Sequence, residues 1–402
     1  MQKSRVVIIA IILLLPIISL SNIIATQDVI PAKTETLGET KAVKKVAVVF
    51  ATGGLGDKSF NDAGIRGLIR AEAEFGTDLI ISYVEPKNVA EFKDYQRDYA
   101  ELETYDLIIC IGFLQKDALN ETSVTYPDQK WVLIDEKITR SNVKSYLYKE
   151  HEGSFLVGAM AGMTTQTGKI GFVGGMDIYV VNKFLAGYVQ GAHHINSSIE
   201  ITAVYRPLPP PDCWNNIPSG KNMGKTLIGK GNDTIFAAAG LTGIGVFQAA
   251  DEADDTYAIG VDSNQDGEMP GVVLCSVLKL VETATYNSIR DIMQDTWTSG
   301  VETLGLKENG MGISPMKYTT TEANTSFILN CINKTRWEHI KDIIDQIKSG
   351  ELVVSDTSTE YEKLATSATT TTISMITSGF EIYWVISLVI FNLMFGICKR
   401  KK

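Results

Sequence analysis

The residues best suited to binding chemistry lie in a glycine-rich loop near the start of the chain, Ala51–Asn61, which reads ATGGLGDKSFN. Its glycines let the backbone approach a ligand closely, and Asp57 or Ser59 can cap a following helix. Phe60 is unusual in so polar a loop, and its ring is either a packing contact of that helix or a platform on which a flat ligand stacks. Asn61 could donate to and accept from the edge of a heterocycle.

Three further polar residues follow apolar runs. Asp135 follows the run WVLI, and Asp262 follows a second run, Tyr257–Val261. An aspartate in such a place is either an ordinary cap or turn residue or a carboxylate that binds a ligand. Lys279 ends another apolar run, and it could form a salt bridge with Asp262 at a hinge.

Other motifs carry little chemistry. Asp262–Gly267 fits the first half of an EF-hand loop, but Val273 stands where a bidentate glutamate is required. Gly220–Thr226 is one residue short of a phosphate-binding loop. His193 and His194 fit a helix end better than a metal site, and no catalytic constellation can be assembled. We therefore expect no metal, no cofactor and no enzymatic activity.

Short apolar runs alternate with helical patterns through the middle of the chain. The expected strands form two series, the first at 46–50, 79–83, 107–111 and 131–134, the second at 170–173, 200–204, 234–238 and 257–261. Apolar strands separated by helices indicate parallel sheets covered on both faces. Two such series predict an α/β protein with two doubly wound lobes. In these sheets ligands bind beyond the carboxyl ends of the strands, where Asp135 and Asp262 lie.

The composition excludes a basic nucleic-acid binder, because the chain of 402 residues carries 37 basic and 47 acidic residues. A basic start and the apolar residues 6–20 predict an export signal over 1–25. The uncharged stretch 382–398 precedes four basic residues, and it predicts a transmembrane helix over 379–398 with a cytoplasmic tail at 399–402. Residues 27–379 then form an ectodomain with 31 basic and 46 acidic residues, a net charge of −15.

The segment before the expected membrane helix is typical of a stalk, since residues 355–378 hold 13 Ser or Thr in 24 positions. Five N-x-S/T sequons begin at Asn120, Asn196, Asn232, Asn324 and Asn333, as in a glycosylated surface protein. Cys213 and Cys331 lie in loop-like surroundings and could form a disulfide in an oxidising exterior.

The pattern G-x-x-D-x-S-F-N after the first strand resembles the basic membrane protein family of substrate-binding proteins, whose best-understood branch is purine nucleoside receptor A-like. Further matches follow in order over roughly residues 44–350. They are WVLID at 131–135, YKEHEGSFLVG at 148–158, GFVGG at 171–175, FLAGYVQG at 184–191, AAAGLTGIG at 237–245, GVDSNQ at 260–265 and VLK at 277–279. Each match alone is weak, but the ordered series is specific.

The resemblance implies the type I periplasmic-binding-protein fold, in which two Rossmann-like doubly wound lobes are joined by a three-strand hinge and hold the ligand between them. It also implies that Phe60 stacks on a nucleoside base and that Asp135 binds the edge of the base. Asp262 should accept from the ribose hydroxyls, and Lys279 should donate to them.

The same resemblance places a second stacking aromatic residue at Trp214. The segment Trp214–Pro218 departs from the family's pattern, because it has an added residue and lacks the family's aspartate. Base selectivity is therefore open, and Trp214 could instead be a surface aromatic residue that packs locally. Gly240 should let the backbone approach the ligand. The full set of expected ligand-binding residues is Asp57, Ser59, Phe60, Asn61, Asp135, Trp214, Gly240, Asp262 and Lys279.

The expected function is an extracellular, membrane-anchored solute-binding protein of an ABC transporter, which binds a purine nucleoside and delivers it to a permease. Two alternatives are a sensory ectodomain coupled to a signalling partner and a cell-surface nucleoside hydrolase. The expected organisation is a signal at 1–25, a first lobe at 45–150 and 263–303, a second lobe at 151–262 and 304–352, a stalk at 355–378, a membrane helix at 379–398 and a basic tail at 399–402.

Overall fold

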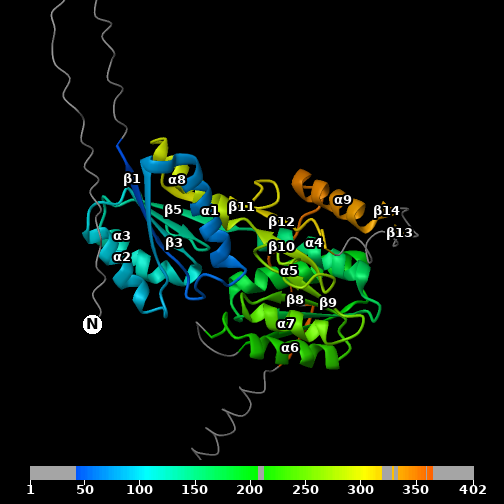
Figure 1. The fold of residues 1–402 in the computed structure, drawn as a ribbon. Coiled ribbons are helices and arrows are strands. Elements are labelled where there is room, and N and C mark those ends of the chain that lie inside the picture. The colour runs from blue at the N-terminus through cyan, green and yellow to red at the C-terminus, as the bar shows by residue number, and fades with distance from the viewer. Residues whose placement is uncertain (1–41, 207–211, 319–327, 330–333, 359, 365–402) are drawn as a thin grey trace, which may run out of the picture. The chain divides into compact units, whose positions relative to one another are not determined.

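The computed structural model describes residues 42–206, 212–318, 328–329, 334–358 and 360–364. Within these residues the chain forms two large sheets, and helices cover both faces of each (Figure 1). The strands that the sequence predicts at 107–111, 131–134 and 234–238 form with the same bounds. Their residues are fully buried, as apolar strands inside a parallel sheet should be.

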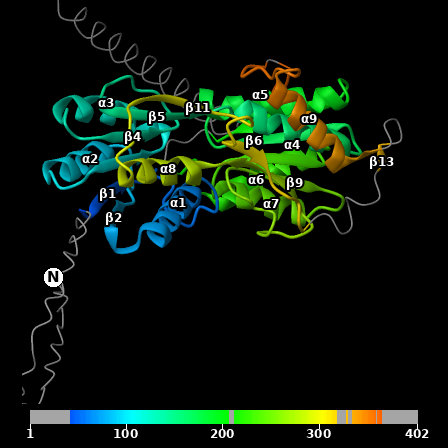
Figure 2. The same cartoon turned by 90° about the horizontal axis from the view of Figure 1, so that it is seen from above.

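The first lobe is built on a six-stranded parallel sheet with the order β11-β5-β4-β3-β1-β2. Its strands are β1 (Lys44–Val49), β2 (Leu79–Val84), β3 (Leu107–Ile111), β4 (Trp131–Ile134), β5 (Val143–Tyr148) and β11 (Gly300–Leu304). Its helices are α1 (Phe60–Phe75), α2 (Glu91–Glu101), α3 (Lys116–Thr125) and α8 (Val281–Met293), with 3-10 turns η1 (Gly76–Asp78) and η2 (Phe113–Gln115). Helices α1 and α8 cover one face, and α2 and α3 cover the other (Figure 2).

The second lobe repeats this plan on a seven-stranded sheet with the order β12-β10-β9-β8-β6-β7-β15. Its strands are β6 (Lys169–Gly174), β7 (Glu200–Tyr205), β8 (Thr234–Ala238), β9 (Tyr257–Gly260), β10 (Val273–Lys279), β12 (Met311–Ile313) and β15 (Glu362–Lys363). Its helices are α4 (Glu150–Thr164), α5 (Tyr179–Ile195), α6 (Ile217–Gly229), α7 (Thr242–Asp251) and α9 (Arg336–Ser349). Helices α4 and α5 pack together, as do α6 and α7, and β13 (Ile328–Leu329) pairs with β14 (Lys334–Thr335).

The chain passes between the lobes three times, from β5 to α4, from β10 to α8 and from β11 to β12. The boundary drawn from the sequence differs in one place, because residues 263–303 were assigned to the first lobe. Strand β10 pairs with β9 and belongs to the second sheet, so the chain returns to the first lobe only after Lys279. No glycine-rich or charged linker marks this crossing, so composition could not show it.

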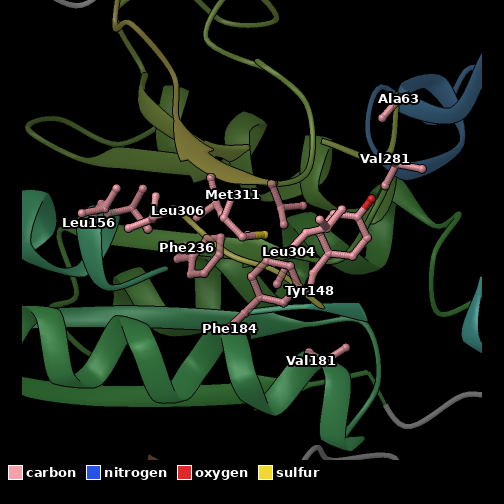
Figure 3. Packing of buried hydrophobic residues seen from close by; sticks show 14 of the residues in the cluster. Ala63, Tyr148, Leu156, Val181, Phe184, Phe236, Val281, Leu304, Leu306 and Met311 are labelled. Atoms are coloured by element: carbon pink, nitrogen blue, oxygen red, sulfur yellow. The ribbon is translucent and has the colours of Figure 1, made fainter. Parts of the chain in front are cut away.

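One hydrophobic core continues through the hinge. The cluster that contains Ala63 and Val281 of the first lobe extends through Tyr148 and Leu304 into the second lobe, where Phe184 and Phe236 belong to it (Figure 3). Because buried side chains fill the space between the crossover strands, the hinge is packed like an interior rather than like a flexible linker.

The end of the described chain lies against the second lobe. Ser355 exchanges hydrogen bonds with Gln190 of α5, at 2.7 and 2.9 Å, and β15 adds a parallel strand beside β7. The composition predicts a stalk over 355–378, but the described residues among 355–364 lie against the lobe through short pairings that a Ser/Thr-rich composition does not reveal. Within the described residues no helix is long and apolar enough to cross a membrane.

Several expectations concern residues outside the described ranges. These are the export signal at 1–25, the rest of the stalk, the membrane helix at 379–398, the tail at 399–402, Cys331, and the sequons at Asn324 and Asn333.

Two expectations about surface chemistry fall on described residues. Asn120 and Asn196 are exposed, but Asn232 is 2% exposed and donates to the carbonyl of Leu227 at 2.8 Å. The folded protein therefore cannot carry a glycan at Asn232. Cys213 is a buried free thiol.

Packing of α4 on α5 predicts a large penalty for one added methyl group. A Cβ at Gly158 would lie 2.2 Å from the carbonyl oxygen of Tyr188, so Gly158→Ala should lower the free energy of unfolding by about 1–3 kcal/mol. Gly229→Ala is the matched control, because no atom lies within 4 Å of its added Cβ. Urea unfolding would measure both, and equal stability of the two variants would contradict this account.

Candidate functional site

A cavity lies at the carboxyl ends of the strands of both sheets. Its enclosed volume is about 90 Å³, and it opens into a wider space of about 710 Å³ that includes bulk solvent. The first lobe contributes residues after β1, β3 and β4, and the second lobe contributes residues after β6, β7, β8 and β9 together with Lys279, the last residue of β10. The ends of these strands are where an open α/β sheet is expected to bind a ligand.

The cavity brings together eight of the nine residues singled out from the sequence. They are Asp57, Phe60, Asn61, Asp135, Trp214, Gly240, Asp262 and Lys279. The ninth, Ser59, does not line the cavity but lies behind Asp262 and donates a hydrogen bond to it. Sequence reasoning missed Thr52, Phe113 and Phe184, which also line the cavity. Phe113 comes two residues after β3 ends, so the rule that ligands bind beyond strand ends could have found it, whereas Phe184 lies within a helix.

Asp57 organises the loop between β1 and α1. Its carboxylate accepts from the backbone N–H groups of Ser59, Asn61 and Asp62 at 2.8–3.1 Å, which caps the first turn of α1. The amide of Asn61 donates to Asp57 at 3.0 Å and accepts from the N–H of Ala51 at 3.0 Å. These bonds fix the start of α1, and with it the ring of Phe60 at the cavity wall.

Asp135 and Asp262 occupy equivalent places in the two lobes. Each comes after the strand that holds the same position in its sheet, β4 in the first and β9 in the second. Both have left-handed backbones, with φ of 83° and 62°. Such a conformation is uncommon outside glycine, and aspartate is one of the residues that tolerate it. The turn after each strand thus presents a carboxylate to the cavity.

Lys279 is the cation of the site, and it is only 1% exposed. Its ammonium nitrogen lies 2.5 Å from Oδ1 of Asp135 and 2.9 Å from Oε1 of Glu150. The rings of Phe60 and Tyr148 also face it, with centroids 5.3 and 5.0 Å away. Burial alone would lower the pKa of Lys279, but the nearby carboxylates, Asp135 first among them, outweigh burial and raise it.

Asp262 has a different environment. The hydroxyl of Ser59, from the first lobe, donates to its Oδ2 at 2.6 Å. Burial raises the pKa of Asp262 to about 7, while Lys279 and the Ser59 hydrogen bond oppose that shift only in part. Burial likewise raises the pKa of Asp135, although Lys279 acts in the other direction. The site therefore holds one carboxyl group that gains or loses its proton near neutral pH.

Trp214 forms part of the opposite wall. Thr242 fixes its loop, since the threonine hydroxyl accepts from the N–H of Asn216 at 2.9 Å and donates to the carbonyl of Cys213 at 3.2 Å. The ring lies where a Cβ at Gly175 would come within 2.2 Å of it, so only glycine leaves room there. Across the cavity the ring meets Phe113 edge-on, with centroids 6.4 Å apart.

The EF-hand-like loop and the histidine pair, which carry little chemistry in the sequence, have structural roles in the fold. Oδ1 of Asp266 accepts from the hydroxyls of Ser276 and Ser314 at 2.7 and 2.9 Å, so this carboxylate ties the apparent half EF-hand to its own sheet. His193 contacts the carbonyl of Ile199 at 2.9 Å and the carboxylate of Glu360 at 3.0 Å. Among the described residues no group of three or more His, Cys, Asp or Glu side chains could hold a metal ion.

Comparison with known proteins identifies the family. Residues 44–352 match the family model described as ABC transporter substrate-binding protein PnrA-like. The chain belongs to this family. The membership agrees with the resemblance drawn from the sequence, and it makes the protein a member of a family of substrate-binding proteins of ABC transporters.

Individual relatives cover most of the chain. An uncharacterized lipoprotein of Pyrococcus abyssi is 32% identical over 367 residues, which is 82% of this chain and 89% of the relative. The ABC transporter nucleoside-binding protein BmpA of Lactococcus lactis is 30% identical over 322 residues, 73% of this chain and 89% of the relative. A solved ABC transporter solute-binding protein from Aeropyrum pernix is 28% identical, with a TM-score of 0.69, and the match covers 79% of this chain and 94% of that one.

The raised pKa of Asp262 predicts a pH dependence of folding. Because this pKa is about 7 in the folded protein and about 4 in an unfolded chain, folding favours the protonated group. Its contribution to stability is fully present below pH 4 and is lost as the pH rises through 7, with a magnitude on the order of 4 kcal/mol at most. Asp262→Asn should remove this component, since asparagine keeps the acceptor for Ser59 and tolerates the backbone.

Urea unfolding of the wild type and of Asp262→Asn at pH 5 and pH 8 measures the effect. The wild type should lose more stability between the two pH values than the variant does. Equal losses would show that Asp262 ionises as an ordinary carboxyl group.

Proposed function

We propose that this protein captures a purine nucleoside outside the cell and delivers it to the permease of an ABC transporter. The observation that carries the proposal is a cavity in which aromatic residues and carboxylates from both lobes meet around a buried lysine. A nucleoside offers a flat ring, a polar base edge and a vicinal diol, and the cavity holds a group suited to each. The relative from Lactococcus lactis, which is named a nucleoside-binding protein, supports the same ligand class.

In the proposed complex the base lies between Phe60 of the first lobe and Trp214 of the second. Stacking on each ring supplies about 1–3 kcal/mol. Asp135 accepts from the base edge, and Gly240 lets the backbone approach the ligand because glycine has no side chain. A ligand that contacts both lobes at once would stabilise the closed arrangement of the lobes.

The sugar binds to the other carboxylate in this proposal. Ionised Asp262 accepts from the two ribose hydroxyls, while Lys279 donates to one of them. Oδ2 of Asp262 already accepts a hydrogen bond from Ser59. Oδ1 of Asp262 and the ammonium group of Lys279 therefore make most of the contacts with the ribose hydroxyls. No group in this scheme attacks the glycosidic bond, so the ligand leaves unchanged.

Mass spectrometry of small molecules released from the purified ectodomain tests the ligand class. A thermal-shift panel of adenosine, inosine, guanosine, uridine and free sugars should then show stabilisation by a nucleoside. Stabilisation by sugars alone would refute the nucleoside proposal. Appearance of free base during incubation would instead favour the hydrolase alternative.

Removing either stacking ring should weaken binding. Phe60→Ala and Trp214→Ala are each expected to raise the Kd for the best purine nucleoside of the panel about 10- to 100-fold. Isothermal titration calorimetry provides the measurement. Tyr83→Ala serves as the control, because this residue is about half exposed on β2 and does not line the cavity. Wild-type affinity in both cavity variants would refute the assigned stacking sites.

We further propose that the apolar segment 379–398 anchors the protein, with the ectodomain outside and residues 399–402 in the cytoplasm. The proposal rests on the composition of that segment and on the export signal, which contains no cysteine for attachment of a lipid.

Expression of the full chain should give a protein that stays in the membrane pellet after an alkaline carbonate wash. The same chain ending at Leu364 keeps every described element and should be released into the medium. Retention of the shortened chain in the pellet would place the anchor elsewhere.

A further inference from the structure

Glu150 is a buried carboxylate that lies next to the cavity without lining it. It is the first residue of α4, directly after the first crossing from one lobe to the other, and it is 1% exposed. A buried carboxylate is costly unless it is paired. Its presence at the hinge therefore needs partners.

Two ammonium groups supply that pairing. Oε1 of Glu150 lies 2.9 Å from the ammonium nitrogen of Lys279, and Oε2 forms an ion pair with Lys183 of α5. Lys183 also donates to the carbonyl of Tyr148, at 2.8 Å, where β5 ends. Burial alone would raise the pKa of Glu150, but the two lysines lower it, so the group is ionised at neutral pH.

The members of this network are divided unevenly between the lobes. Glu150, Lys183 and Lys279 belong to α4, α5 and β10 of the second lobe, whereas Asp135 follows β4 of the first. When the lobes separate to admit a ligand, Lys279 can lose Asp135 and still keep Glu150. The ammonium group therefore stays compensated and in place through opening.

We propose that Glu150 is a positioning residue for ligand binding, which holds Lys279 at the hinge so that Asp135 and Asp262 stay available to the ligand. This inference rests on the proposed nucleoside site. Without Glu150, the charge of Lys279 would be compensated only by the two carboxylates that should bind the ligand. Binding would then have to break a stronger ion pair inside the cavity.

The charged and titratable groups around Lys279 and Asp262 allow a test by pH. Lys279 faces Asp135 after β4, Tyr148 of β5, Glu150 of α4 and Asp262 after β9. Asp262 also faces Asp57 and the Ser59 hydroxyl before α1, and Glu150 also faces Lys183 of α5. Neutralising Glu150 removes one negative charge from this group. The ionised form of Asp262 is then repelled by one negative charge fewer, so the pKa of Asp262 should fall.

Glu150→Gln tests the proposal, because glutamine keeps the shape and an acceptor but not the charge. Titration calorimetry with adenosine, inosine and guanosine should show a Kd at least 10-fold higher than in the wild type. The double variant Glu150→Gln/Lys183→Met also removes the ammonium group whose counter-charge the first change takes away. It should regain thermal stability while its Kd stays as high as in Glu150→Gln.

If Glu150 contributed only to the stability of the fold, a different result would be expected. In that case affinity would recover together with stability in the double variant, and this outcome overturns the proposal. Wild-type affinity in Glu150→Gln overturns it as well.

A ligand-free measurement separates this inference from the nucleoside assignment. The change of unfolding free energy with pH that Asp262→Asn abolishes should have its midpoint at lower pH in Glu150→Gln. If the wild type binds none of the three nucleosides, the proposed function fails, and this midpoint alone decides the role of Glu150. An unchanged midpoint overturns the inference.

Discussion

A buried ammonium group can exist in this protein only because carboxylates surround it, and much of the site follows from that constraint. Lys279 is 1% exposed and ends the strand from which the chain returns to the first lobe. In this structure it is paired with Asp135 on one side and Glu150 on the other, at 2.5 and 2.9 Å. The start of α4, in the same lobe, holds Glu150 beside the end of β10, and the turn after β4 brings Asp135 to it from the other lobe. Lys279 also interacts with a third carboxyl group in the cavity, that of Asp262. One lysine therefore partly compensates the charges of three carboxyl groups.

The packing around the hinge gives this network its fixed geometry. The hydrophobic core is continuous from α1 and α8, through Tyr148 and Leu304, to α4 and α5. Ion pairs in such surroundings are hardly screened by water, so each charge depends strongly on its partner. The cost of burying these groups is consistent with a binding role, because stability alone would be served as well by apolar side chains of similar volume.

The sequence predicted the parts of the molecule that are locally encoded. Apolar runs such as 107–111 and 131–134 became buried strands, and Asp135 and Asp262 reached the cavity because each follows such a run. Strand β5 was not predicted, because Lys144 and Ser145 interrupt VKSYLY, which is neither a continuous apolar run nor a regular alternation. The pairing of Glu150 with Lys183 and Lys279 could not be predicted either, because it joins residues up to 129 positions apart that only the tertiary fold brings together. The same holds for Gly175, whose lack of a side chain makes room for the ring of Trp214.

The contacts between the lobes suggest how a ligand enters. On the side of α1, Ser59 donates to Asp262, and the hydroxyl of Ser263 donates back to the carbonyl of Ser59 at 2.7 Å. Across the cavity, Phe113 and Trp214 meet only through the edge of one ring, which is a weaker contact than a pair of buried hydrogen bonds. The lobes should therefore part first at the two rings and turn about the side of Ser59. Since Trp214 is also the proposed stacking platform, a ligand that enters there would replace Phe113 as the neighbour of the indole and close the path behind it.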